Sequence, residues 1–293
     1  MNYQEFIGSV TGILRESLPC ETELNLVPVE KNNGVIMDGL TIRKKGQHVA
    51  PTIYLDSYYR EYLSGRSVKN ICDQILGCCE ETDFMERFDT DFFTDYRKIK
   101  PTVVYKLIHY ERNRSLLERI PHLPFLDLAI VFYCLLNDTP AGNATVLIHN
   151  SHLELWNISF QELYQEARKN APRLLPAELK AMSEVLEELT GEQETAEIPM
   201  YVLTNTRRAL GAACILYDEV LKSCAERIGE AFYLLPSSIH EMILLPDSAA
   251  IHARELLAMV REINTTQVRD TEVLSDQIYY YSPDSGQISM LKD

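Results

Sequence analysis

The sequence lacks the glycine-rich loops that bind phosphate groups. Glycine accounts for only 12 of the 293 residues, and neither G-x-G-x-x-G nor G-x-x-x-x-G-K-[ST] occurs, so the commonest routes to nucleotide binding are missing. The chain also has no C-x-x-C and no H-E-x-x-H pattern, which removes two frequent zinc signatures. No apolar run approaches the ~20 residues of a membrane-spanning helix. We therefore expect no cofactor, no metal and no membrane insertion.

Positive charge is also scarce. The chain has 28 Lys and Arg against 43 Asp and Glu, a formal net charge of −15. This balance argues against binding to a nucleic-acid backbone, because such binding needs cations that displace counterions from phosphate. It argues equally against anionic membrane surfaces. A basic partner would suit the charge, but a soluble, acidic cytoplasmic protein is the simpler interpretation, and we favour it.

The seven cysteines are odd in number and irregular in spacing, so they do not predict a disulfide framework. Cys72 and Cys79 fall on the apolar face of a predicted helix, and Cys134 and Cys214 lie in apolar runs. These positions are typical of small buried side chains in a reducing compartment. The first residues have no basic segment followed by an apolar core, so we expect no signal peptide and a cytoplasmic location.

Residues 1–98 are predicted to form an N-terminal α+β module. Apolar periodicity predicts, in order, a helix over 2–18, strands over 24–29, 35–43 and 51–55, a short helix over 56–65 and a helix over 67–86. Asn33 and Gly34 lie between the first two strands and tolerate positive φ, which favours a hairpin there. The three strands would then form an antiparallel meander.

Residues 99–293 are predicted to form the main α+β domain. Its first half reads as a strand or helix over 103–110, a short helix over 113–120, a buried strand over 125–136, a loop over 137–142, a return strand over 145–149, helices over 159–172 and 176–189, and a loop over 191–197. Ser159 and Glu162 form a capping box at the start of one helix, and we expect Pro172 to end it.

A central β-β-α-β-β block over 199–246 is the part of the chain with the clearest pattern. It comprises strands over 201–203 and 210–216, a helix over 218–229 and strands over 232–235 and 242–245. A helix with a buried face of Leu256, Met259, Val260 and Ile263 follows, and then a terminal hairpin of 277–281 and 287–291. Most of the predicted strands follow one another as hairpins, and helices lie between the hairpins. This order predicts an α+β fold with mainly antiparallel sheet.

The segment 236–241 collects the residue types of a hydrolytic site. Ser237, Ser238, His240 and Glu241 could supply a nucleophile, a base and an orienting carboxylate. However, members of a triad usually come from distant segments, and no glycine elbow surrounds either serine. Ser238 with Glu241 three residues later also matches a capping box, and a simple turn would fit as well. We favour a structural role for these four residues.

Three other groups could carry a site. Asn205, Arg207 and Arg208 follow a strand, and paired arginines can hold phosphate or carboxylate, although a solvated hairpin turn is the simpler interpretation. His149 and His152 have metal-ligand spacing, but we expect them at a strand end without a third ligand. The tyrosines at 58, 59, 62 and 279–281 could form a recognition surface, although strand tyrosines more often cover the edge of a core.

Three stretches resemble a bacterial domain-of-unknown-function family that is frequent in gut Clostridia. They are 156–170 around Trp156-Asn157-Ile158-Ser159, 201–213 around Leu203-Thr204-Asn205, and 235–246 around Ile239-His240-Glu241. Two segments closer to the C-terminus, 260–264 and 274–281, fit the same family. The resemblance implies a bacterial source and a cytoplasmic location, and it supplies no catalytic residues.

These observations favour a non-catalytic cytoplasmic protein. It would bind another protein or a small molecule through the 204–208 turn and the 236–241 segment. The alternative is a hydrolase or transferase in which His240 acts as base, a serine as nucleophile, and Glu241 or Asp276 orients the histidine. A third hypothesis is an acidic regulator that occupies the basic surface of a nucleic-acid-binding protein.

Overall fold

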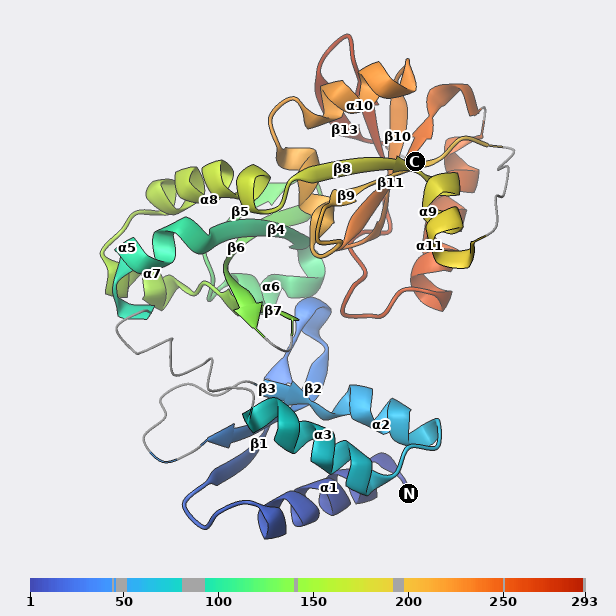
Figure 1. The fold of residues 1–293 in the computed structure, drawn as a ribbon. Coiled ribbons are helices and arrows are strands. Elements are labelled where there is room, and N and C mark those ends of the chain that lie inside the picture. The colour runs from blue at the N-terminus through green and yellow to red at the C-terminus, as the bar shows by residue number, and fades with distance from the viewer. Residues whose placement is uncertain are drawn as a thin grey trace. The chain divides into compact units, whose positions relative to one another are not determined.

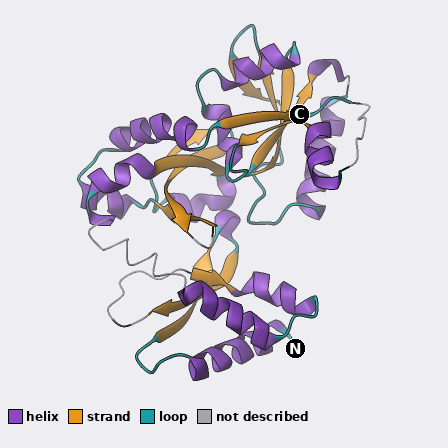
Figure 2. Ribbon diagram, in the orientation of Figure 1, coloured by secondary structure: helices purple, strands orange, loops and turns teal. Residues whose placement is uncertain are grey.

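The computed structural model describes residues 1–43, 45, 52–80, 93–139, 142–191, 198–249 and 251–291. The side chains of 78–80, 137–139, 142–144, 189 and 237 lie outside this description. Helices alternate with three antiparallel sheets (Figure 2), which confirms the predicted α+β class. The side chain of Cys79, the predicted loop 191–197 except Gly191, and the predicted helix beyond Glu80 lie outside this description.

The chain divides into two compact units. The first comprises residues 1–31, 35–100 and 135–145, and the second comprises 32–34, 101–134 and 146–293. A division into domains 1–98 and 99–293 stays a prediction, because compactness alone does not establish that a segment folds by itself.

The first unit contains a three-stranded sheet of order β1-β2-β3 and the helices that follow and precede it (Figure 1). Its elements are α1 (Tyr3–Ser17), β1 (Glu23–Glu30), β2 (Ile36–Arg43), β3 (Thr52–Tyr54), α2 (Leu55–Leu63), α3 (Val68–Glu80) and α5 (Tyr96–Ile99). The predicted meander is confirmed by the antiparallel pairing of β1 with β2 and of β2 with β3.

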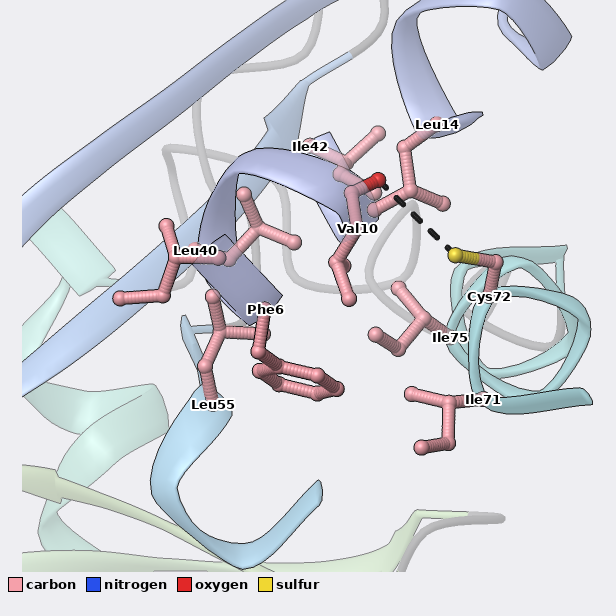
Figure 3. Packing of buried hydrophobic residues seen from close by; sticks show 10 residues of the cluster. Phe6, Val10, Leu14, Leu40, Ile42, Leu55, Ile71, Cys72 and Ile75 are labelled. Carbon is pink, nitrogen blue, oxygen red and sulfur yellow. Dashed lines mark hydrogen bonds between the residues drawn. The ribbon is translucent and has the colours of Figure 1, made fainter. Parts of the chain in front are cut away.

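One apolar cluster holds this unit together. Phe6, Val10 and Leu14 of α1 pack with Leu40 of β2 and with Ile71, Cys72 and Ile75 of α3 (Figure 3). The helical spacing of the α1 and α3 residues places them on one face of each helix, as the sequence predicted. The Cys72 Sγ lies 3.8 Å from the carbonyl oxygen of Val10, so this thiol is a buried packing group, and burial raises its pKa.

The second unit contains two sheets. Its elements are η1 (Asn32–Gly34), β4 (Val103–His109), η4 (Glu111–Asn113), α6 (Arg114–Leu117), β5 (His122–Phe125), β6 (Leu128–Thr139), β7 (Gly142–Leu147), α7 (Asn150–Trp156), α8 (Phe160–Leu174), β8 (Ala177–Ala181), α9 (Met182–Thr190), β9 (Tyr201–Asn205), η5 (Gly211–Leu216), α10 (Val220–Ile228), β10 (Phe232–Ser238), β11 (Glu241–Pro246), η6 (Asp247–Ala249), α11 (Ala253–Thr266), β12 (Tyr279–Ser282) and β13 (Gln287–Met290). The 3₁₀ turn η3 (Lys100–Thr102) precedes β4, and β6 and β7 extend into residues of the first unit.

The larger sheet has the order β13-β12-β10-β11-β9-β8, and the smaller one has β4-β6-β5 with β7 beside β6. Side chains alternate between the two faces of each strand. On β11, Met242 and Leu244 are fully buried on one face, whereas Ile243 and Leu245 pack with α11 on the other. By the same alternation, position 241 lies on the face of the sheet that packs against α11. The candidate site lies on this face.

A partly buried carboxylate, that of Asp127, links the turn between β5 and β6 to Ser275 and to Tyr279 at the start of β12. The hydroxyl of Tyr279 donates to Asp127 Oδ1 at 2.6 Å, and the hydroxyl of Ser275 donates to Asp127 Oδ2 at 2.6 Å. Tyr279 and Ser275 are both fully buried. Asp127 is therefore the acceptor for two hydroxyl groups that have no access to water.

The turn at Asn33 and Gly34 has the predicted positive φ angles, 63° and 70°. The side-chain Nδ2 of Asn33 donates to the carbonyl oxygens of Asp270 and Val273 at 2.7 and 2.8 Å. Its Oδ1 accepts from Asn113 Nδ2 at 3.0 Å. The turn is therefore fixed by its side chain as well as by its backbone.

Two predicted elements are of the wrong type. The segment expected as a helix from 176 contains strand β8, which pairs antiparallel with β9, and the helix α9 begins only at Met182. Pairing with β9 overrides the helical propensity of Ala177–Ala181. The segment 210–216, expected as a strand, is the 3₁₀ helix η5. Leu210 has φ 56°, which turns the chain out of the extended conformation.

Several boundaries also differ from expectation. Pro172 lies inside α8, which continues to Leu174. Within the predicted loop 137–142, β6 continues to Thr139 and β7 begins at Gly142, and residues 140–141 lie outside the description. On α11, Met259 and Ile263 are exposed, whereas Leu257 and Asn264 are buried beside Leu256 and Val260. The α11 helix turns an adjacent face to the sheet because its apolar stripe is wider than the surface that it covers.

Candidate functional site

The loop after β9 is organised by one buried asparagine. Asn205 is fully buried, its Nδ2 donates to the carbonyl oxygen of Ala209 at 2.8 Å, and its Oδ1 accepts from the backbone N–H of Arg207 at 3.0 Å. Arg208 and Leu210 in this loop have positive φ angles of 51° and 56°. Because such angles are unfavourable for residues with a Cβ atom, the side chain of Asn205 stabilises a costly backbone conformation.

The segment 238–241 forms the turn between β10 and β11. Ser238 pairs with Glu241 across the turn, and the Ser238 hydroxyl accepts from the backbone N–H of His240 at 3.0 Å. Thr204 Oγ1 donates to the carbonyl oxygen of His240 at 2.8 Å. The interpretation of Ser238 and Glu241 as a helix cap is therefore wrong, and that of a turn is correct. The side chain of Ser237 lies outside the described residues.

The imidazole of His240 is used to hold the neighbouring loop. The backbone N–H of Leu210 donates to its Nδ1 at 3.1 Å, so in the neutral ring the proton is on Nε2. Nε2 lies 3.9 Å from Oε1 of Glu272. Burial lowers the pKa of His240, and the carboxylates of Glu272 and Glu241 oppose this effect. In the neutral ring, the lone pair of Nδ1 already accepts a hydrogen bond from Leu210, and Nε2 carries the proton. Neither nitrogen can therefore accept a proton from a serine.

The lowered pKa of His240 predicts an acid-sensitive fold. The folded-state pKa of His240 is below the usual 6.5 of a histidine in the unfolded chain. The neutral ring therefore stabilises the folded state at pH values above 6.5, and this stabilisation is lost as the pH falls below 6.5. His240→Asn places an amide oxygen near the Nδ1 position but does not titrate. Between about pH 7 and pH 5.5 we expect the variant to lose less free energy of unfolding than the wild-type chain.

Urea unfolding followed by the fluorescence of Trp156, the single tryptophan, measures this difference in the second unit. Burial also lowers the pKa values of His109, His149 and His152. His149→Asn should therefore also reduce the acid sensitivity, through a separate contribution that adds to that of His240→Asn. Equal acid sensitivity of the wild-type and His240→Asn chains would contradict the role assigned to His240.

A cavity of about 170 Å³ lies beside this loop and turn. It is lined by Glu178, Lys180, Val185, Val202, Thr204, Arg208 and Glu241. Lys180 pairs with Val202 and Glu178 with Thr204 across β8 and β9, so these four side chains share one face of the sheet. The loop supplies Arg208, the turn supplies Glu241, and α9 supplies Val185.

The cavity brings together two segments that the sequence singled out separately. Arg208 and Glu241 both line it, and Asn205 and His240 hold the backbone behind them. Arg207 does not line the cavity, although it is adjacent to Arg208. The interpretation of 204–208 as a hairpin turn is wrong, because no strand follows it directly.

Sequence reasoning missed the two cavity residues on β8. Glu178 and Lys180 flank Leu179, and this alternation of polar and apolar residues was the available signal for a strand. Lys180 Nζ lies 2.5 Å from Glu188 Oε1, and Arg208 Nη2 lies 2.5 Å from Glu188 Oε2. Hydrogen bonds from Lys180 and Arg208 lower the pKa of Glu188, which is thus a carboxylate shared by two cations.

The remaining candidates lie apart from this cavity. His149 is the N-cap residue of α7, and its backbone N–H donates to Nδ1 of His152 at 3.1 Å. Within the described residues, no group of three or more His, Cys, Asp or Glu side chains could hold a metal ion. Asp276 forms an ion pair with Arg112. Tyr279 is buried against Asp127, and its strand is not part of the cavity wall.

A comparison with protein families gives one match. The model of DUF5688, a family of unknown function, matches residues 3–283. The chain belongs to the DUF5688 family. This confirms the resemblance to a domain-of-unknown-function family, whereas a bacterial origin stays a prediction. We found no match for the chain among curated proteins or solved structures.

The DUF5688 match includes residues of both compact units. Arg208, His240 and Glu241 therefore lie within the part of the chain that matches the family model. No helix in the described ranges of this DUF5688 chain has the length and apolar character needed to cross a membrane.

Proposed function

We propose that this DUF5688 protein is a non-catalytic binding protein whose ligand occupies the cavity beside β8, β9 and β11. The observation that supports this function is the convergence of Arg208 and Glu241, from segments far apart in the sequence, on one cavity. The neighbouring Asn205, Ser238 and His240 use their hydrogen-bonding groups to position this backbone. Charged groups held by a rigid loop favour recognition over proton transfer.

Fragment binding tests this proposal directly. We expect small polar fragments to shift the backbone amide resonances of Val202 and Thr204 in NMR spectra of the full chain. Arg208→Ala should weaken the best fragment about tenfold, because it removes a charged contact within the cavity. Arg207→Ala is the matched control, since this neighbouring arginine does not line the cavity, and should leave the affinity unchanged.

Two results would refute the proposed site. The fragments could bind elsewhere and leave Val202 and Thr204 unaffected, or Arg207→Ala and Arg208→Ala could weaken binding equally. The second result would indicate a general effect of positive charge on the loop.

We further propose a cytoplasmic location and a small-molecule or protein partner. The cysteines with described side chains, Cys20, Cys72, Cys134, Cys214 and Cys224, all have free thiols. Free thiols at these positions favour a reducing compartment. The net charge of −15 continues to argue against a nucleic-acid backbone as partner.

A hydrolase or transferase is the second candidate. One distance favours it, the 3.9 Å between Nε2 of His240 and Oε1 of Glu272, because a carboxylate beside a histidine is part of a triad. A fluorophosphonate probe that reacts with serine nucleophiles distinguishes the two functions. Covalent labelling that is lost in both Ser238→Ala and His240→Asn would support the enzyme, and an unlabelled chain would support the binding protein.

A further inference from the structure

The two cations of the cavity are arranged around a carboxylate that belongs to the chain itself. Lys180 contacts one oxygen of Glu188 and Arg208 contacts the other, each at 2.5 Å. One cation on each oxygen is an arrangement that binds any carboxylate group. Glu188, which is not itself one of the residues that line the cavity, therefore occupies a carboxylate subsite that strand β8 and the loop after β9 provide.

Glu188 is held weakly enough to be replaced. It lies on α9, where every residue whose side chain is described is exposed or only partly buried. The side chains of Glu188, Arg208 and Lys180 are 42%, 49% and 25% exposed. Ion pairs with this exposure contribute little to stability. A ligand carboxylate can take the place of Glu188 without disturbing a packed core.

The other charges of the cavity determine what the rest of the ligand carries. Glu178 and Glu241 also line the cavity. Glu178 Oε1 lies 3.8 Å from Lys180 Nζ, whereas within the described chain Glu241 has no ion pair with a cation. Once Glu188 is displaced, two cations face two carboxylates, and the lining is neutral. A dianion such as phosphate would place uncompensated negative charge beside Glu178 and Glu241. A ligand with one carboxylate and one ammonium group preserves the balance.

Size and apolar contacts restrict the ligand further. Val185 and Val202 line the same cavity and provide an apolar contact for a side chain. A volume of about 170 Å³ is below the ~300 Å³ at which pockets for drug-sized ligands begin. The cavity is therefore matched to a compact ligand.

We infer that the cavity binds a small zwitterion of the α-amino-acid class with an apolar side chain. Its carboxylate replaces that of Glu188 between Lys180 and Arg208, and its ammonium group faces Glu241. This inference rests on the proposed binding function and specifies its ligand.

Calorimetric titration of the full chain with L-valine, isobutyrate, isobutylamine and inorganic phosphate tests this ligand class. L-valine carries both charges, whereas isobutyrate and isobutylamine each carry one. We expect L-valine to bind at least tenfold more tightly than either single-charge analogue, and phosphate to bind no better than isobutyrate. Tighter binding of phosphate than of L-valine would overturn the inference.

Variants of α9 and β8 test the displacement of Glu188. Glu188→Gln removes the competing carboxylate and should tighten L-valine binding about tenfold. Glu187→Gln, on the same helix and without an ion pair to Lys180 or Arg208 in the described chain, should leave the affinity unchanged. Lys180→Met should weaken binding about tenfold, with circular dichroism as the check on folding. Since Glu188→Gln predicts a gain, loss of folding cannot produce the expected result.

The results separate this inference from the function on which it rests. If polar fragments bind in the cavity but L-valine does not, the ligand class is wrong and the binding site stands. If neither fragments nor L-valine bind there, both proposals fail. Weaker binding in Glu188→Gln would show that Glu188 contacts the ligand rather than competing with it, and would overturn the displacement.

Discussion

Gly211→Ala will lower the free energy of unfolding of the second unit by about 3 kcal/mol or more. A Cβ atom at this position would lie 2.3 Å from Thr204 Oγ1, 2.6 Å from the carbonyl oxygen of His240 and 2.8 Å from the backbone nitrogen of Asn205. Two of these neighbours are backbone atoms, which cannot rotate away. The added methyl group must separate the loop from the turn, and it breaks the hydrogen bond from Thr204 to His240.

Urea unfolding followed by Trp156 fluorescence gives this free energy for the second unit. Gly12→Ala is the matched control, because a Cβ atom at Gly12 meets no heavy atom within 4 Å. Gly12 lies inside helix α1, where alanine is more favourable than glycine by about 0.5–1 kcal/mol. Circular dichroism should therefore record a small stabilisation there. A change of less than about 0.5 kcal/mol in Gly211→Ala would refute the tight approach of the three segments.

Asp127→Ala has the second large expected effect. The substitution leaves the buried hydroxyl groups of Tyr279 and Ser275 without their acceptor. Buried polar groups that lose a charged partner cost about 1.5–3 kcal/mol each. We therefore expect a loss of about 3 kcal/mol in the free energy of unfolding, measured by the same fluorescence assay.

Tyr279→Phe helps to assign the effect of Asp127→Ala. It removes one of the two hydroxyl groups and leaves Asp127 bonded to Ser275, so the loss should be about 1–2 kcal/mol. In the double variant the two effects should not add, because both remove the same hydrogen bond. Asp218→Ala removes an exposed aspartate, whose side chain is 71% exposed, and should have little effect. Full additivity would argue against a direct bond between Asp127 and Tyr279.

Elements whose sequence signals are local could be predicted well. Apolar residues at helical spacing define α1 and α3, and the Asn33-Gly34 pair defines the hairpin between β1 and β2. The capping box of Ser159 and Glu162 is also correct, with both reciprocal hydrogen bonds present. In each case the residues that determine the conformation lie within a few positions of one another.

The secondary structure of the central block could be predicted only in part, because it depends on pairing between strands that are far apart in the sequence. Strand β8 exists through its ladder with β9, some 20 residues later, and a short window cannot detect such a partner. In the 3₁₀ helix η5, Gly211 lies so close to Thr204 and His240 that a Cβ atom would not fit. Both contacts join segments that the sequence separates.

The candidate site could also be predicted only in part from the sequence, because its residues come together through long-range pairing. Arg208, His240 and Glu241 stood out by residue type, but their roles differ from those expected. His240 binds the backbone of Leu210, and Arg208 binds Glu188. Lys180 and Glu178 were not recognised as candidate site residues, because a helix was predicted over 176–189. Residue type thus indicated where the cavity is, and only the strand register identified its other wall.

The clamped turn at Asn33 affects how the protein ages chemically. An asparagine followed by glycine readily deamidates when the glycine nitrogen attacks the side-chain amide carbon. In the folded chain, Nδ2 of Asn33 donates to two carbonyl oxygens and Oδ1 accepts from Asn113, so the amide group is fixed and cannot rotate toward attack. Isoaspartate at position 33 would therefore form in molecules whose turn has opened. The amount of isoaspartate then reports how often this turn opens.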